Sequence, residues 1–232
     1  MTDLPLLSLI LLVPLVAFVV ILALPARAAR AIKVVSATAG AVDLVLALVV
    51  WGSYDQVAAG FQFEQSFPWI ASLGIHYTVA VDGWGVALTA LNALVFFTGS
   101  LSMWTLQTRV KEYFAFMALL VFGVFGVFIS LDVFVFFFFY EVAVLPMYPL
   151  IAVWGSTRKE YSAMKLTLYL MLGSALLFPA LIGMHHAAGI DSWDVRALAA
   201  AALDKDTQIF LYPFIYLGFG ILAGMFPFHG WS

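Results

Sequence analysis

The amino-acid sequence predicts an all-α protein, a polytopic bundle of about seven transmembrane helices. Of its 232 residues, 65% are hydrophobic and only 10% are charged. Soluble domains average roughly 45–50% apolar and 25% charged residues. The apolar stretches are also continuous, whereas membrane-spanning strands require alternation. Most stretches approach the roughly 20 residues with which a helix crosses a bilayer.

Apolar runs and the polar breaks between them place the helices along the chain. We expect them at roughly 4–25, 32–52, 84–106, 113–130, 133–153, 162–187 and 208–228, each end to within a few residues. The first run is long for a signal peptide, and its positive charges follow the apolar core, so we interpret it as a retained helix. Residues 1–232 are therefore predicted to form a single transmembrane domain.

The connections between these runs carry patterns of their own. The longest, from about 53 to 82, contains the alternating stretch GIHYTVAV, which is compatible with a short surface hairpin. The connection 188–207 fits either a short helix lying on the surface or an ordinary polar loop. Ser130 and Asp132, between the fourth and fifth runs, are residue types that cap helices.

Basic residues indicate how the bundle is oriented. Eight of the ten Lys and Arg residues fall on one side of the predicted bundle: Arg27, Arg30, Lys33, Arg109, Lys111, Arg158, Lys159 and Lys165. The other side holds Arg196 and Lys205. The positive-inside rule therefore places the N-terminus outside and the loops after the first, third and fifth helices in the cytoplasm.

Two carboxyl groups fall in the middle of predicted helices, Asp43 in the second and Glu141 in the fifth. A carboxylate inside a bilayer costs about 2–3 kcal/mol on insertion scales, so such residues are commonly functional. Glu141 fits a proton relay, in which a movable positive partner changes its proton affinity. The alternative is a protonated side chain that joins two helices by a hydrogen bond. For Asp43 we favour a role in helix packing or in contact with a neighbouring subunit.

Lys165 and His229 complete the candidate proton path. Lys165 opens the sixth helix, where it serves either a proton entry path or as an interfacial lysine that reaches toward water. His229 stands in MFPFHGWS, next to a proline that would break or end the seventh helix, and broken helices mark ion pathways in transporters. A histidine near a helix end is also compatible with a simple interfacial position.

Several cofactors and partners are excluded by composition. The chain has no cysteine, so cysteine-held zinc and iron–sulfur sites are impossible. It has no Gly-rich phosphate loop after a strand and no Lys/Arg-rich patch for nucleic acid. We therefore expect no cofactor, no metal and no redox centre in this chain.

Four stretches, in order, resemble subunit M (chain 4) of proton-pumping NADH-quinone oxidoreductase, respiratory complex I. They are FPWIASLGIHYTVAVDGWGVAL, FISLDVFVFFFFYEVAVLPMYPLIAVWG, AMKLTLYLMLGS and FPFHGW. The resemblance implies an antiporter-like fold of two inverted repeats, of which this chain would hold the first, apparently truncated before helix eight. It also implies that Glu141 belongs to a proton channel, and that sister membrane subunits, lipid and a quinone bound elsewhere in the complex are the partners.

The resemblance has one departure, and it leaves alternatives open. The family usually carries a lysine in helix seven as the partner of the glutamate, but Leu222 stands at that position. A lysine in the next helix, or Lys165, would then take its place. The resemblance implies a bacterial inner membrane with a periplasmic N-terminus. The alternatives are a subunit of a sodium/proton antiporter or a membrane-bound hydrogenase, and a scaffold that does not pump.

Overall fold

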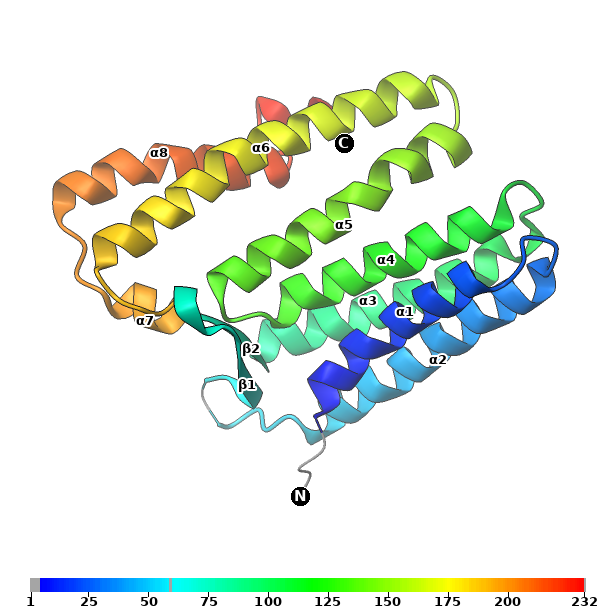
Figure 1. The fold of residues 1–232 in the computed structure, drawn as a ribbon, viewed down its shortest axis with the longest axis horizontal. Coiled ribbons are helices and arrows are strands. Elements are labelled where there is room, and N and C mark those ends of the chain that lie inside the picture. The colour runs from blue at the N-terminus through cyan, green and yellow to red at the C-terminus, as the bar shows by residue number, and fades with distance from the viewer. Residues whose placement is uncertain (1–4, 59, 232) are drawn as a thin grey trace.

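The computed structural model describes residues 5–58 and 60–231, and it is a bundle of long helices (Figure 1). The helices are α1 (Leu6–Ala23), α2 (Ala29–Ser53), α3 (Gly83–Ser102), α4 (Val110–Ile129), α5 (Val133–Trp154), α6 (Lys159–Ala188), α7 (Val195–Ala200) and α8 (Lys205–Leu222). Six of the described helices, α1 to α6, are long and apolar enough to cross a membrane. The predicted all-α, polytopic fold class is confirmed.

The helices pack in an order that divides the bundle into two halves. Helices α1 to α4 form one group, α5 packs on α4, and α6 packs on both α5 and α8 (Figure 1). The main cluster of buried apolar side chains draws on α1 to α4 and on Val135 and Phe139 of α5, and includes nothing from α6 or α8. The bundle is therefore dense on the α1–α4 side and looser toward α8.

Glycines bring α4 and α5 into close contact. A side chain added to Gly123 would meet the backbone nitrogen of Ala143 at 2.5 Å, and one added to Gly126 would overlap the ring of Phe139. Small residues allow such an approach between membrane helices. This contact, the α4–α5 seam, joins the two halves.

A β-hairpin and α7 cover one end of the bundle, the hairpin end (Figure 1). Strand β1 (Gln62–Ile70) pairs antiparallel with β2 (Ile75–Val81) around a short turn that closes at Gly74, whose φ is 67°. The stretch GIHYTVAV forms the second strand, as its alternation predicts, but most of this strand is buried. Of the two interpretations of 188–207, the structure has the short helix, α7.

Lysines close the helix ends at the opposite, basic end, where the α1–α2, α3–α4 and α5–α6 loops lie (Figure 1). Lys33, Lys111 and Lys159 each point their Nζ atom at the C-terminal carbonyls of a helix. They donate, at 2.6 to 2.8 Å, to Trp104 and Leu106, to Leu22 and Leu24, and to Val153, respectively. These carbonyls have no partner within the helix, and a cation there also favours the helix dipole.

The last predicted helix, 208–228, is shorter in the structure. Helix α8 ends at Leu222, and Gly224 adopts a left-handed conformation with φ of 68°, which is typical of a helix terminus. A short 3₁₀ turn, η3 (Phe228–Trp231), follows. Helix α8 is also missing from the six candidate spans, because its first turn contains Lys205 and Asp206.

Candidate functional site

Helix α5 carries the candidate proton-binding residue, and Asp132 determines where this helix begins. Its Oδ1 atom accepts hydrogen bonds from the backbone amides of Phe134 and Val135 at 2.9 and 3.1 Å, so Asp132 is an N-cap, as its residue type predicts. The helix then runs through Pro146 and Pro149 without ending. Glu141 lies about 12 Å beyond the helix start, at 1.5 Å per residue.

Glu141 belongs to the face of α5 that packs on α6. One turn earlier on the same face, the ring of Phe137 stacks on Phe178 of α6, with centroids 4.7 Å apart. The two helices run antiparallel, so one turn forward on α5, from Phe137 to Glu141, corresponds to one turn back on α6, from Phe178 to Ser174. Glu141 and Ser174 are therefore at the same level. The structure therefore brings a carboxyl group and a hydroxyl group together in the α5–α6 interface.

Three buried polar atoms at this level have no hydrogen-bond partner among the described residues. They are Oε1 of Glu141, the hydroxyl of Tyr140 and the hydroxyl of Ser174. Tyr140 lies close enough to Ser174 and Glu141 for both to act on it electrostatically. Buried polar atoms are normally paired, so unpaired groups at one place mark a site for a proton or water. Tyr140 and Ser174 are the residues of this group that the sequence alone did not single out as site residues.

A cavity of about 800 Å³ is lined by one of these residues, Tyr140. Its lining is mostly apolar and comes from α3, α4, α5, α6, α8 and η3; Tyr140, Leu222 and Trp231 are part of it. Leu222 packs on Gly173, where an added side chain would lie 2.6 Å from its Cδ2 atom. Leu222, at the position where the resemblance implies a lysine, therefore lines the same cavity as Tyr140.

Lys165 and the segment with His229 lie together. A side chain added to Gly230 would be 3.1 Å from Nζ of Lys165, and His229 stacks on Phe226 with centroids 5.6 Å apart. Glu141 is not part of this contact. It is level with Ser174, which lies about 13 Å along α6 from Lys165, at 1.5 Å per residue.

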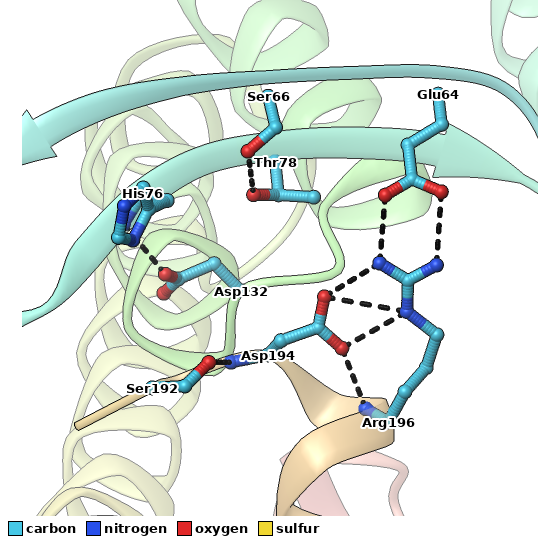
Figure 2. Close-up of polar contacts among 8 residues, drawn as sticks. All are labelled: Glu64, Ser66, His76, Thr78, Asp132, Ser192, Asp194 and Arg196. Atoms are coloured by element: carbon cyan, nitrogen blue, oxygen red, sulfur yellow. Dashed lines mark hydrogen bonds and ion pairs between the residues drawn. The ribbon is translucent and has the colours of Figure 1, made fainter. Parts of the chain in front are cut away.

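A second group of polar side chains lies at the hairpin end (Figure 2). Arg196 of α7 binds both carboxylate oxygens of Glu64 at 2.7 and 2.9 Å and also contacts Asp194 at 2.7 Å. Hydrogen bonds from Arg196 lower the pKa of the Glu64 and Asp194 carboxyl groups, and these contacts raise the pKa of the guanidinium. The ion pair joins residues 132 positions apart, so no local pattern predicts it.

Asp132 links this group to the membrane helices. Besides capping α5, it accepts a 2.9 Å hydrogen bond at Oδ2 from the backbone amide of His76 on β2 (Figure 2). Burial raises the pKa of Asp132, and the hydrogen bonds from His76, Val135 and Phe134 oppose that shift. Asp132 therefore fixes the start of α5 to the hairpin.

Together, the spans and the buried carboxyl groups define a multi-pass membrane protein with a polar site inside its helix bundle. Residues 130–232 match the model of the family described as NADH:quinone oxidoreductase/Mrp antiporter, transmembrane. Relatives named chain 4 and subunit M confirm the resemblance to that subunit.

Similar proteins agree with this assignment. The chain is 34% identical to NAD(P)H-quinone oxidoreductase chain 4 3 of Picosynechococcus sp., over 83% of its own length and 35% of the relative's. It is 31% identical to NADH-quinone oxidoreductase subunit M of Rhodobacter capsulatus, over 85% and 40%. The fold also matches a chain of respiratory complex I from Thermus thermophilus with bound NADH, with a TM-score of 0.85 and 21% identity, over 97% of this chain and 45% of that one. The chain thus spans about a third of the length of the curated relatives that it matches.

Proposed function

We propose that this chain is part of a proton-translocating membrane subunit of an NADH-quinone oxidoreductase. In this role it carries no redox centre of its own. The enzyme activity belongs to the complex, in which sister membrane subunits are its partners and the quinone binds elsewhere. The observation that carries the proposal is the buried, unpaired Oε1 of Glu141 in the middle of α5, next in the chain to Tyr140, which lines a large cavity.

Glu141 is the proton-binding group in this proposal. In a low-dielectric interior its charged form needs a positive partner or water, so its proton affinity depends on what occupies the cavity. The hydroxyls of Tyr140 and Ser174 have no hydrogen-bond partner among the described residues either, and hydroxyls can both donate and accept, so they could pair with water that reaches Glu141. Leu222 faces the cavity in place of a lysine, so the positive partner must come from another residue.

Lys165 and His229 are assigned to proton access. Lys165 lies in the basic-end half of α6, about 13 Å along the helix from the level of Glu141, and the η3 turn that contains His229 lies beside it. With the positive-inside rule, this end faces the cytoplasm of a bacterial inner membrane and the N-terminus faces the periplasm. Protons would then enter near Lys165 and reach Glu141 through the cavity.

The test is proton pumping by the intact complex that carries Glu141→Gln in the full-length subunit. Glutamine keeps the size and the hydrogen-bonding capacity but cannot bind and release a proton. We expect the proton-to-electron ratio to fall while the complex still assembles. The matched control is Glu160→Gln, an exposed glutamate in the first turn of α6. Wild-type pumping by Glu141→Gln would overturn the proposal and favour a scaffold in which Glu141 joins helices.

A sodium/proton antiporter subunit is the alternative, because the matching family includes the Mrp antiporters. The 34% identity to a quinone oxidoreductase chain favours the first function. Pumping measured with and without sodium distinguishes the two. Proton transport that requires sodium on the opposite side would support the antiporter.

A further inference from the structure

The second carboxyl group inside the membrane, Asp43, lies on a polar face of α2. Buried residues recur on this helix every three or four positions, which places them on one side: Lys33, Ser36, Gly40, Asp43, Ala47 and Val50. This face packs on α3, where the hydroxyls of Ser36 and Ser100 lie 2.9 Å apart. The buried polar residues of this face therefore extend from Lys33 at the basic end to Asp43 near the membrane centre.

Asp43 is completely buried and unpaired. Its exposed fraction is 0%, and neither carboxyl oxygen has a hydrogen-bond partner among the described residues. The antiparallel register set by Ser36 and Ser100 places it level with Ala93, one turn from Thr89. The hydroxyl of Thr89 is also buried without a partner. Full burial excludes the contact with a neighbouring subunit that the sequence left open for Asp43.

Among the residues that the structure describes, no opposite charge is placed near Asp43. Helices α1 and α3 carry no charged residue, and α4 carries charges only in its first turn. Lys33 is ten residues away, about 15 Å along α2. A buried carboxylate without a hydrogen bond or counter-charge from the described residues is strongly disfavoured, which favours the protonated acid. The described residues also form no cluster of His, Asp and Glu that could hold a metal ion.

A close helix contact lies on the basic-end side of Asp43. Between the Ser36–Ser100 pair and Asp43, Gly40 lies so close to α3 that an added side chain would be 2.7 Å from the Cα atom of Phe97. The two helix backbones are therefore in contact at this point. Proton exchange between the serine pair and the carboxyl group would require α2 to move away from α3 here.

We propose that Asp43 is a second proton-binding site, which exchanges its proton with the basic end when α2 and α3 separate at Gly40. Its ligand is a proton, because a single carboxyl group without further oxygen ligands does not hold an alkali cation. The site lies in the dense half of the bundle, apart from Glu141. It is independent of the function proposed for Glu141, and neither proposal requires the other.

Infrared spectroscopy of the intact complex tests the proposal, with the aspartate carboxyl carbons isotopically labelled. Wild type should show the carbonyl stretch of an undissociated aspartic acid at neutral pH, and Asp43→Asn should lose it. The same band should change during turnover and recover at rest. Asp55→Asn, which removes an exposed aspartate, is the matched control and should leave the band unchanged.

Two outcomes would overturn the proposal. The absence of the band in resting wild type would mean that Asp43 is ionised. A band that stays constant during turnover would make Asp43 a fixed structural acid. Asp43→Glu keeps the carboxyl group if the asparagine variant does not assemble, and it should retain a shifted band. Gly40→Ala, which wedges the helices apart, should speed hydrogen–deuterium exchange of the band.

Discussion

Asp43 and Glu141 are the same kind of group in two different surroundings. Asp43 is fully enclosed by α1 to α4, at a place where helix backbones touch. Glu141 is half-buried between α5 and α6, at the level of Tyr140, which lines a cavity of about 800 Å³. A carboxyl group in the membrane therefore does not by itself define a proton path. Packing density decides whether water and a positive partner can reach it.

The sharpest test of this difference introduces a lysine near each carboxyl group. Ala93→Lys places a long cation in a position with an exposed fraction of 0%, and we expect destabilisation of at least about 3 kcal/mol because the charge has no room to hydrate. Leu222→Lys enters the cavity and should cost less. Thermal unfolding of the full-length subunit in the complex measures both. Equal destabilisation would remove the distinction between the halves.

The next test concerns the α4–α5 seam. Gly126→Ala forces a methyl group into the ring of Phe139, and overpacking of this kind costs about 1–3 kcal/mol. The control is Gly99→Ala on α3, where the nearest atom is 3.9 Å away, the Sδ atom of Met117. We expect a lower unfolding temperature for the seam variant only. If Gly126→Ala is as stable as the control, the halves are not held by this contact.

A smaller effect is expected at the start of α5. Asp132→Ala removes the cap and the bond to the His76 amide, and loss of an N-cap typically costs about 1 kcal/mol. Asp132→Asn should recover much of that loss, because an amide oxygen also accepts from backbone amides. Hydrogen exchange of the Phe134 and Val135 amides is the measurement. Unchanged protection in Asp132→Ala would show that the cap is dispensable.

The smallest effect is expected at Arg196. Its ion pairs are partly exposed, so Arg196→Ala should change stability by less than about 1 kcal/mol at neutral pH. The pKa values of Glu64 and Asp194 are lowered by Arg196, so the stabilisation exists above their ordinary range and is lost as the pH falls through the lowered values. Acid unfolding should therefore be less steep in the variant. Lys205→Ala, an exposed cation in α8, serves as the control.

Hydropathy and charge predicted most of the fold, because membrane helices and their orientation depend on local runs of apolar and basic residues that are visible in the sequence. The continuous apolar runs predicted seven spans, of which six are long and apolar enough in the structure, and Asp132 was recognisable as a cap from its residue type and place. The end of α8 was missed because hydropathy remains high through the left-handed turn at Gly224. A pattern of residues alone does not register that change of backbone conformation.

The candidate site was only partly predictable. Glu141 stands out because its cost in a membrane is high, whereas Tyr140 and Ser174 are ordinary residues until the α5–α6 register brings them level with it. Arg196 and Glu64 are far apart in sequence, and only the folded hairpin end joins them. Whether Glu141, Lys165 and His229 form one proton path stays a prediction.

The three lysines that bind carbonyls at the basic end have two roles, one during membrane insertion and one in the folded protein. While the chain inserts, Lys33, Lys111 and Lys159 contribute to the positive charge that holds their loops on one side. After folding, the same ammonium groups seal the ends of α3, α1 and α5. Moving these lysines to reverse the membrane orientation would therefore also remove the hydrogen bonds to the carbonyls at three helix ends. The same three side chains therefore contribute both to membrane topology and to local stability.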